Sequence, residues 1–201
     1  MSDDKLPLVE EFYSLQGEGY NTGKAAYFIR LGGCDVGCSW CDSRFAWNKD
    51  MHPMVNTDRI VDSVLGSGAD SVVVTGGEPL MWNLDYLCSQ LKQNEICTFI
   101  ETSGAYPFSG KWDWICLSPK KNMPPVGDIC NKANELKVII ETPSDFEWAE
   151  KYSRMVKEDC HLFLQPEWKR FEEVIPFIVE YIRKNTKWRI SLQVHKYMHI
   201  P

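Results

Sequence analysis

Three of the eight cysteines in this chain lie close together and are the side chains best placed to do chemistry. Cys34, Cys38 and Cys41 follow the spacing C-x3-C-x2-C in a glycine-rich segment. A 4Fe–4S cube usually takes four thiolates, so three thiolates would leave one iron free to bind another ligand. The amine and carboxylate of an amino acid can chelate such an iron. The spacing therefore predicts an iron–sulfur cluster with one open iron.

The same cysteines could instead belong to a structural zinc site or to a ferredoxin-like cluster. A structural zinc ion takes four nitrogen or sulfur ligands, and His52 could complete a Cys3His set. Zinc sites more often pair two C-x2-C knuckles, and the sequence has no second one. A ferredoxin-like carrier has a fourth cysteine followed by proline, and no cysteine here precedes proline. The pattern favours the open cluster, on which S-adenosylmethionine fits because it offers an amine, a carboxylate and a reducible sulfonium.

Composition and charge narrow the class of protein. The chain has 201 residues, which suits a single domain over residues 1–201. Its net charge of -6, without a block of lysine and arginine, argues against a nucleic-acid partner. No apolar run approaches the ~20 residues of a membrane span, and the polar start lacks the order of a secretory signal. We therefore expect a cytoplasmic protein in which the other five cysteines are not disulfide-bonded.

Short apolar runs alternate with stretches of helical spacing, which predicts βα units and a largely parallel sheet. The predicted strands are residues 27–31, 72–75, 98–101, 114–117, 136–140, 162–164 and 189–194. The predicted helices are residues 57–65, 83–91, 144–156 and 171–182, and Thr57 could cap the first of them. Because these strands are too few for a closed eight-stranded barrel, the expected fold is an α/β partial barrel of about six parallel strands.

Chemistry in such folds sits at the carboxyl ends of the strands. The polar and glycine-rich segments of the sequence follow the predicted strands at five places, which are residues 32–41, 75–80, 101–104, 118–120 and 165–168. We therefore expect these five segments to share one site.

Two motifs together resemble the radical S-adenosylmethionine superfamily. The first is the three-cysteine motif, and the second is Gly76-Gly77-Glu78-Pro79 directly after a predicted strand. In that superfamily this second segment binds the methionine amine of the cofactor. The resemblance implies the same role here, and a carboxylate such as that of Glu78 suits an ammonium group.

Further segments narrow the resemblance to the 7-carboxy-7-deazaguanine synthase family, over residues 10–201. They include Leu15-Gln16-Gly17-Glu18 before the cysteines, Glu101-Thr102-Ser103-Gly104 and Ser118-Pro119-Lys120 after them, and the C-terminal Ile200-Pro201. The resemblance implies ring contraction of 6-carboxy-5,6,7,8-tetrahydropterin with loss of ammonia, as in queuosine and 7-deazapurine biosynthesis. It also implies hydrogen abstraction at C6 by a 5′-deoxyadenosyl radical, a homodimer, Mg2+, and an external one-electron donor such as a flavodoxin or ferredoxin.

The resemblance assigns site roles position by position. The cluster ligands are Cys34, Cys38 and Cys41. The implied S-adenosylmethionine contacts are Trp40, Glu78, Gly104, Ser118, Pro119, Lys120, Gln165 and Pro166. The implied substrate contacts are Leu15, Gln16, Gly17, Glu18, Arg30, Thr102, His195 and Pro201. Plainer interpretations stay open for some of them: a surface ion pair for Arg30, loop turns for Gly104 and Pro166, and a structural role for His195.

One position departs from the family. The family usually has threonine after the Cys-Asp pair, where its hydroxyl helps to bind Mg2+, and this chain has Ser43. A serine hydroxyl is also a hard oxygen ligand. Nearby, Trp47 could cover the cofactor or fill space. Two rival functions also stay open, a glycyl-radical activating enzyme and a non-enzymatic iron–sulfur or zinc module.

Overall fold

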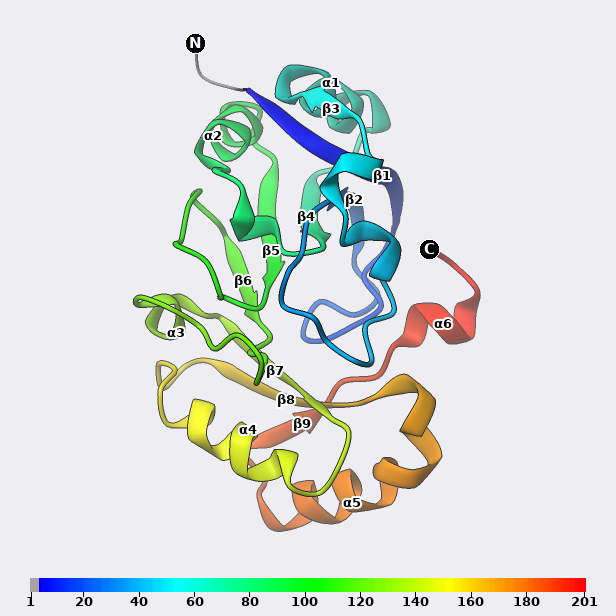
Figure 1. The fold of residues 1–201 in the computed structure, drawn as a ribbon, viewed down its shortest axis with the longest axis vertical. Helices are drawn as coiled ribbons and strands as arrows, with labels where there is room; N and C mark the ends of the chain where they lie inside the picture. Colours follow the sequence, from blue (N-terminus) through cyan, green and yellow to red (C-terminus); the bar gives the residue numbers. More distant parts are fainter. Residues whose placement is uncertain (1–3) are drawn as a thin grey trace.

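A single mixed sheet runs through the computed structural model, which describes residues 4–201. Its strand order is β3-β1-β2-β4-β5-β6-β7-β8-β9 (Figure 1). The strands are β1 (Lys5–Leu15), β2 (Ala25–Leu31), β3 (Met54–Asn56), β4 (Ser71–Gly76), β5 (Cys97–Thr102), β6 (Trp114–Leu117), β7 (Glu135–Ile140), β8 (His161–Pro166) and β9 (Trp188–Ile190).

The strands from β2 onward, apart from β3, are parallel and follow one another in chain order, as in a β/α barrel. The short β3 and β9 stand at the two ends of the described sheet and do not pair with each other. The predicted α/β partial barrel is therefore confirmed, with seven parallel strands where about six were expected. β1 pairs antiparallel with both β2 and β3, and these two strands extend the sheet beyond β2.

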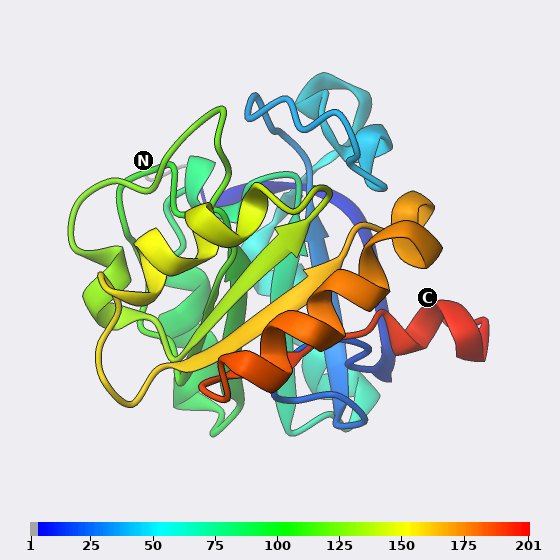
Figure 2. The ribbon, with the colours of Figure 1, turned by 90° about the horizontal axis from the view of Figure 1, so that it is seen from below.

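Helices cover the outer, convex face of the sheet. Figure 2 shows α4 and α5 lying across β7 and β8. The helices are α1 (Thr57–Ser67), α2 (Asp85–Gln93), α3 (Ile129–Lys132), α4 (Asp145–Ser153), α5 (Phe171–Lys184) and α6 (Val194–Met198), with short 3-10 turns η1 (Arg44–Ala46), η2 (Lys49–Met51), η3 (Pro79–Met81) and η4 (Trp168–Arg170). No helix within residues 4–201 is long and apolar enough to cross a membrane.

Alternate residues of each parallel strand face opposite sides of the sheet, because the side-chain period of a strand is two. In β7, Leu136, Val138 and Ile140 are fully buried in the main apolar core beneath the helices. Their neighbours Glu135 and Lys137 point to the concave side. The main core therefore lies outside the sheet, and on the concave side polar residues share the surface with a smaller apolar cluster of Ala26, Phe28, Val73 and Phe99.

Three features differ from the sequence predictions. No strand was predicted at β1 or β3, whose polar residues obscure the apolar pattern. The final strand ends at Ile190 rather than at residue 194, because Ser191 turns toward Gln165 and the backbone nitrogen of Val194 donates to the carbonyl of Gly17. The start of α1 was expected to be capped by Thr57, but the side chain of Asn56 caps it.

Candidate active site

A cavity of about 660 Å³ opens at the carboxyl ends of the parallel strands. All three motif cysteines line it, together with most of the residues that the sequence singled out. Those residues are Leu15, Gln16, Gly17, Glu18, Arg30, Trp40, Ser43, Glu78, Thr102, Ser118, Lys120, Gln165, Pro166, His195 and Pro201. As expected, all five strand-end segments contribute residues to the lining of this one cavity within residues 4–201.

The cysteine loop is held in place by its backbone. The amide nitrogens of Gly33 and Cys34 donate to the carbonyls of Ala46 and Trp47, at 2.7 and 3.0 Å. Each of the three cysteines is half-buried and reaches the cavity. Burial raises the pKa of Cys34 to about 11 and also raises that of Cys38. These groups are thiols at neutral pH in the metal-free chain, so loading a cluster must release protons.

The residues at the loop fit a three-thiolate cluster better than a Cys3His zinc ion. His52, the fourth ligand that zinc would need, bonds through Nε2 to the carbonyl oxygen of Phe45 at 2.9 Å. His52 is not among the described residues that line the cavity with the cysteines. Within residues 4–201, three thiols reach one cavity, and three thiolates would leave one iron of a cluster open.

The Gly76-Gly77-Glu78 turn packs directly on the cysteine loop. A Cβ atom at Gly77 would collide with the carbonyl oxygen of Gly33, and one at Gly76 would collide with the backbone of Leu31. The amide nitrogen of Glu78 donates to that same Gly33 carbonyl at 2.8 Å. The two glycines therefore bring the end of β4 into backbone contact with the cysteine loop.

Glu78 is buried, and its carboxylate is already well occupied. One oxygen accepts from the amide of Leu80 at 3.0 Å and from the Thr102 hydroxyl at 2.5 Å. The other accepts from the amide and the hydroxyl of Ser103, at 2.8 and 2.5 Å. These bonds tie the end of β4 to the end of β5. The predicted pairing of Glu78 with a cofactor ammonium would have to share these bonds, and it stays a prediction.

The remaining predicted cofactor positions divide into two groups. Lys120 lies with its ammonium 5.4 Å from the ring centre of Trp40 and donates to the carbonyl and hydroxyl of Ser118, at 2.7 and 2.5 Å. Burial lowers the pKa of Lys120. Gly104 and Pro119 do not line the cavity: Gly104 packs against Leu117, and the Pro119 carbonyl accepts from Trp148.

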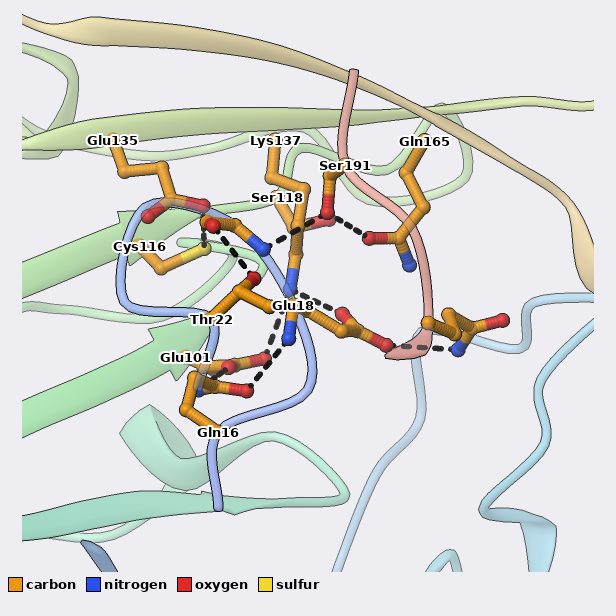
Figure 3. Close-up of polar contacts among 12 residues, drawn as sticks. Gln16, Glu18, Thr22, Glu101, Cys116, Ser118, Glu135, Lys137, Gln165 and Ser191 are labelled. Atoms are coloured by element: carbon orange, nitrogen blue, oxygen red, sulfur yellow. Dashed lines mark hydrogen bonds and ion pairs between the residues drawn. The ribbon is translucent and has the colours of Figure 1, made fainter. Parts of the chain in front are cut away.

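A charged network lies on the concave face of the sheet (Figure 3). The Lys137 ammonium lies between two carboxylates, at 2.5 Å from Glu18 and 3.1 Å from Glu101. The side-chain amide of Gln16 donates to the other Glu101 oxygen at 2.8 Å, and the amide oxygen of Gln16 accepts from the backbone of Glu18. Three elements, β5, β7 and the loop after β1, therefore present one polar array to the cavity.

Lys137 is a site residue that the sequence analysis missed. Its side chain is only 4 % exposed. Burial by itself lowers the pKa of Lys137, but the carboxylates of Glu101, Glu18 and Glu135 raise it well above the usual value. Burial alone would raise the pKa of Glu18, and Lys137 holds it below its usual value. The sequence contained a signal that could have identified it. Lys137 lies inside the apolar run 136–140, and a charged residue is rarely buried without a partner.

Arg30 and Ser43 meet at the rim of the cavity. The guanidinium of Arg30 is ion-paired with Glu10 at 2.6 Å and donates to the Ser43 hydroxyl at 3.3 Å. That hydroxyl lies 3.2 Å from a carboxylate oxygen of Asp42. An ion pair for Arg30, one of the two interpretations left open, is thus present, and it coexists with a place in the cavity lining.

The C-terminal segment closes one side of the cavity. Gln193 donates to Glu18 at 2.8 Å, and Lys196 pairs with Asp42 at 2.8 Å. Gly17 lies so close to His195 that a Cβ atom would collide with the imidazole ring. Pro201 lines the cavity although it is exposed.

The fold and the three-cysteine loop define an iron–sulfur enzyme of the radical S-adenosylmethionine class. A family model described as a 4Fe-4S single cluster domain matches residues 15–108. The chain is 55% identical to the 7-carboxy-7-deazaguanine synthase of Flavobacterium psychrophilum, over 98% of this chain and 94% of that protein. It is 46% identical to the enzyme of that name from Synechocystis sp., over 96% and 93%.

A solved structure agrees with these relatives. The crystal structure of QueE from Escherichia coli is similar with a TM-score of 0.85 and 30% sequence identity, covering 95% of each chain. The chain therefore belongs to the 7-carboxy-7-deazaguanine synthase family. The resemblance inferred from the motifs is confirmed.

Proposed function

We propose that the chain converts 6-carboxy-5,6,7,8-tetrahydropterin to 7-carboxy-7-deazaguanine with loss of ammonia. The observation that carries this proposal is one cavity that joins the cysteine loop to the Glu18–Lys137–Glu101 network. A glycyl-radical activating enzyme would share the cysteines and the Gly76-Gly77-Glu78 turn. It would not need a buried array of carboxylates and amides suited to a small polar heterocycle.

The lining chemistry suits a pterin. The 2-amino-4-oxo ring of a pterin carries N–H donors on one edge, and Glu18 and Glu101, both ion-paired with Lys137, offer acceptor oxygens. The flat ring would lie among aromatic side chains that line the same cavity. These are Phe12, Phe28, Phe45 and Trp168. Arg30, whose guanidinium suits a carboxylate, is available for the 6-carboxyl group.

The chain's own residues bind and orient the two small molecules and exclude water. Cys34, Cys38 and Cys41 would hold the cluster, and Lys120, Ser118 and Gln165 would contact S-adenosylmethionine. When bound, the cluster and S-adenosylmethionine supply one-electron reductive cleavage to a 5′-deoxyadenosyl radical. Glu18, Glu101 and Lys137 hold the heterocycle by one edge in the same cavity. Gln193 and Lys196 keep the C-terminal segment over it through Glu18 and Asp42.

Several further assignments belong to the same proposal. Ser43, with Asp42 beside it, supplies hard oxygen atoms for Mg2+ near the substrate carboxylate. His195 and the terminal carboxylate of Pro201 contact substrate at the cavity edge. The enzyme acts as a homodimer and receives its electron from a flavodoxin or ferredoxin. A cytoplasmic location and a single domain over residues 1–201 stay predictions.

The experiment is anaerobic reconstitution of the cluster followed by turnover with the carboxylated tetrahydropterin. We expect formation of 7-carboxy-7-deazaguanine and ammonia, measured by chromatography with mass detection. The tetrahydropterin without its 6-carboxyl group should be converted poorly, because Arg30 and Mg2+ would lose their partner. A loaded protein that cleaves S-adenosylmethionine but leaves the pterin unchanged would contradict the proposed substrate while leaving the class intact.

A further inference from the structure

Trp47 follows η1 and is bound to the cysteine loop by both its backbone and its side chain. Its carbonyl accepts from the amide of Cys34 at 3.0 Å, and its amide donates to the carbonyl of Arg44 at 3.1 Å. The Arg44 guanidinium lies 5.5 Å from the centre of the indole ring, within the range of a cation–π contact. The ring is therefore held from several directions at the wall of the cavity.

The indole N–H of Trp47 donates to the Sγ atom of Cys41 at 3.3 Å. Five other tryptophans donate their indole N–H to oxygen: Trp82, Trp112, Trp114, Trp148 and Trp188. Trp47 thus makes an unusual contact, and its acceptor is one of the three sulfur atoms that would hold the cluster. Its role goes beyond covering the cofactor or filling space, the two interpretations that the sequence left open.

We propose that Trp47 is a positioning residue that orients Cys41 and raises the reduction potential of the cluster. Hydrogen bonds to the sulfur atoms are among the factors that set the potential of such clusters. Reduction adds negative charge to the cluster and its thiolates, so a donor on one sulfur stabilises the reduced state more than the oxidised state. The proposal needs the cluster but not the pterin, so it can fail or succeed independently of the proposed substrate.

The test compares two substitutions that remove an indole N–H near the same loop. Trp47→Phe removes the donor to the Cys41 sulfur and keeps an aromatic ring. Trp82→Phe is the matched control, because the Trp82 indole donates at 2.9 Å to the backbone carbonyl of Gly32 and not to sulfur. The reconstituted proteins are titrated anaerobically, and the reduced cluster is counted by electron paramagnetic resonance. Thermal unfolding of each protein reports whether the fold is intact.

We expect Trp47→Phe to lower the midpoint potential. A change of about tenfold in the one-electron reduction equilibrium corresponds to ~59 mV, and Trp82→Phe should shift it much less. The direction of the shift in midpoint potential is informative. Water admitted beside the smaller ring would add dipoles that favour the reduced state, and this would raise the potential. An unchanged or higher potential in Trp47→Phe, or an equal shift in Trp82→Phe, overturns the proposal.

A second measurement does not depend on any variant folding or loading. In the unsubstituted protein, with 15N-labelled indole, the reduced cluster should show hyperfine coupling to an exchangeable proton and to an indole nitrogen. The proton coupling should disappear after exchange into deuterium oxide. Absence of a coupled indole nitrogen in the unsubstituted protein also overturns the proposal.

Discussion

The two faces of the sheet use the same strands for different purposes. In β7, Leu136 and Val138 lie in the apolar core under the helices, while Lys137 between them is buried against carboxylates on the concave face. The convex side chains contribute stability by leaving water. The concave side chains cost desolvation that ion pairing offsets only in part. Apolar side chains could fill this position on the concave face without that cost. The buried charge of Lys137 therefore indicates a functional role.

A second carboxylate centre on the convex side shows what a structural ion pair looks like. Glu150 on α4 accepts from Lys187 at 2.7 Å, from the Trp188 indole at 2.8 Å and from the Tyr181 hydroxyl at 3.0 Å. These bonds join α4 to α5 and β9. They lie away from the described cavity, whereas Glu18 and Lys137 line it. The number of hydrogen-bond partners therefore does not distinguish a functional carboxylate from a structural one. Its position in the cavity lining does distinguish them.

The largest effect should come from the cysteine loop. Cys38→Ala should abolish S-adenosylmethionine cleavage, because two thiolates are too few to hold the cube with one iron open. The measurement is iron content and 5′-deoxyadenosine formation after reconstitution. Cys97→Ser, at an exposed cysteine outside the cavity lining, is the control and should keep both. Cleavage that survives Cys38→Ala would refute the cluster assignment.

The next prediction compares Lys137 with Leu136, its neighbour in β7, whose side chain lies on the opposite face of the sheet. Lys137→Met should lower pterin turnover on the order of 100-fold, because Glu18 and Glu101 lose their buried ion-pair partner. Cofactor cleavage without turnover should largely persist. Burial would then raise the pKa of Glu18, so the acid limb of the turnover profile should move to higher pH. The measurement is kcat and KM across pH.

Leu136→Ala is the matched control for Lys137→Met. Leu136 is fully buried in the core, so its truncation should destabilise the fold by about 2–5 kcal/mol. Turnover per folded molecule should change little at low temperature. If Lys137→Met leaves turnover intact and lowers the melting temperature as Leu136→Ala does, the functional distinction between the two faces is wrong.

The sequence predicted which residues come together at the cavity better than it predicted the Glu18–Lys137–Glu101 network inside the cavity. The cysteine spacing, the glycine pair before Glu78 and the strand-end rule predicted that these residues would lie together, and most of them line one cavity, because local spacing and strand polarity determine their placement. Lys137 was missed because the run 136–140 was assigned as an apolar strand, and the lysine inside it was given no role. The contacts of Gln193 and Lys196 depend on where the chain turns after β9, which no local pattern determines.

The next prediction concerns Glu150 on the convex side, whose contribution to stability should be lost at low pH. Burial tends to raise the pKa of Glu150, but hydrogen bonds from Lys187, Trp188 and Tyr181 lower it to about 2, against a usual 4.5. A depressed pKa in the folded state gives stability that is present above pH 4.5 and is lost as the pH falls toward 2. Glu150→Gln should therefore lower the melting temperature at pH 7 by a few degrees. The difference from the unsubstituted chain should shrink between pH 4.5 and pH 3, and a constant difference would contradict this origin.

The smallest effect concerns Ser43, at the rim of the concave face. If its hydroxyl is a ligand, turnover should rise with added Mg2+, and Ser43→Ala should blunt that response by several-fold. Ser43→Thr should preserve or strengthen it, because it restores the family residue and its methyl group restricts the hydroxyl rotamer. Ser43 also accepts from Arg30, so both variants are compared at saturating pterin to separate metal binding from substrate binding. Equal rates in chelator and in Mg2+ would exclude the metal role and would leave Ser43 as a hydrogen-bond partner of Arg30 alone.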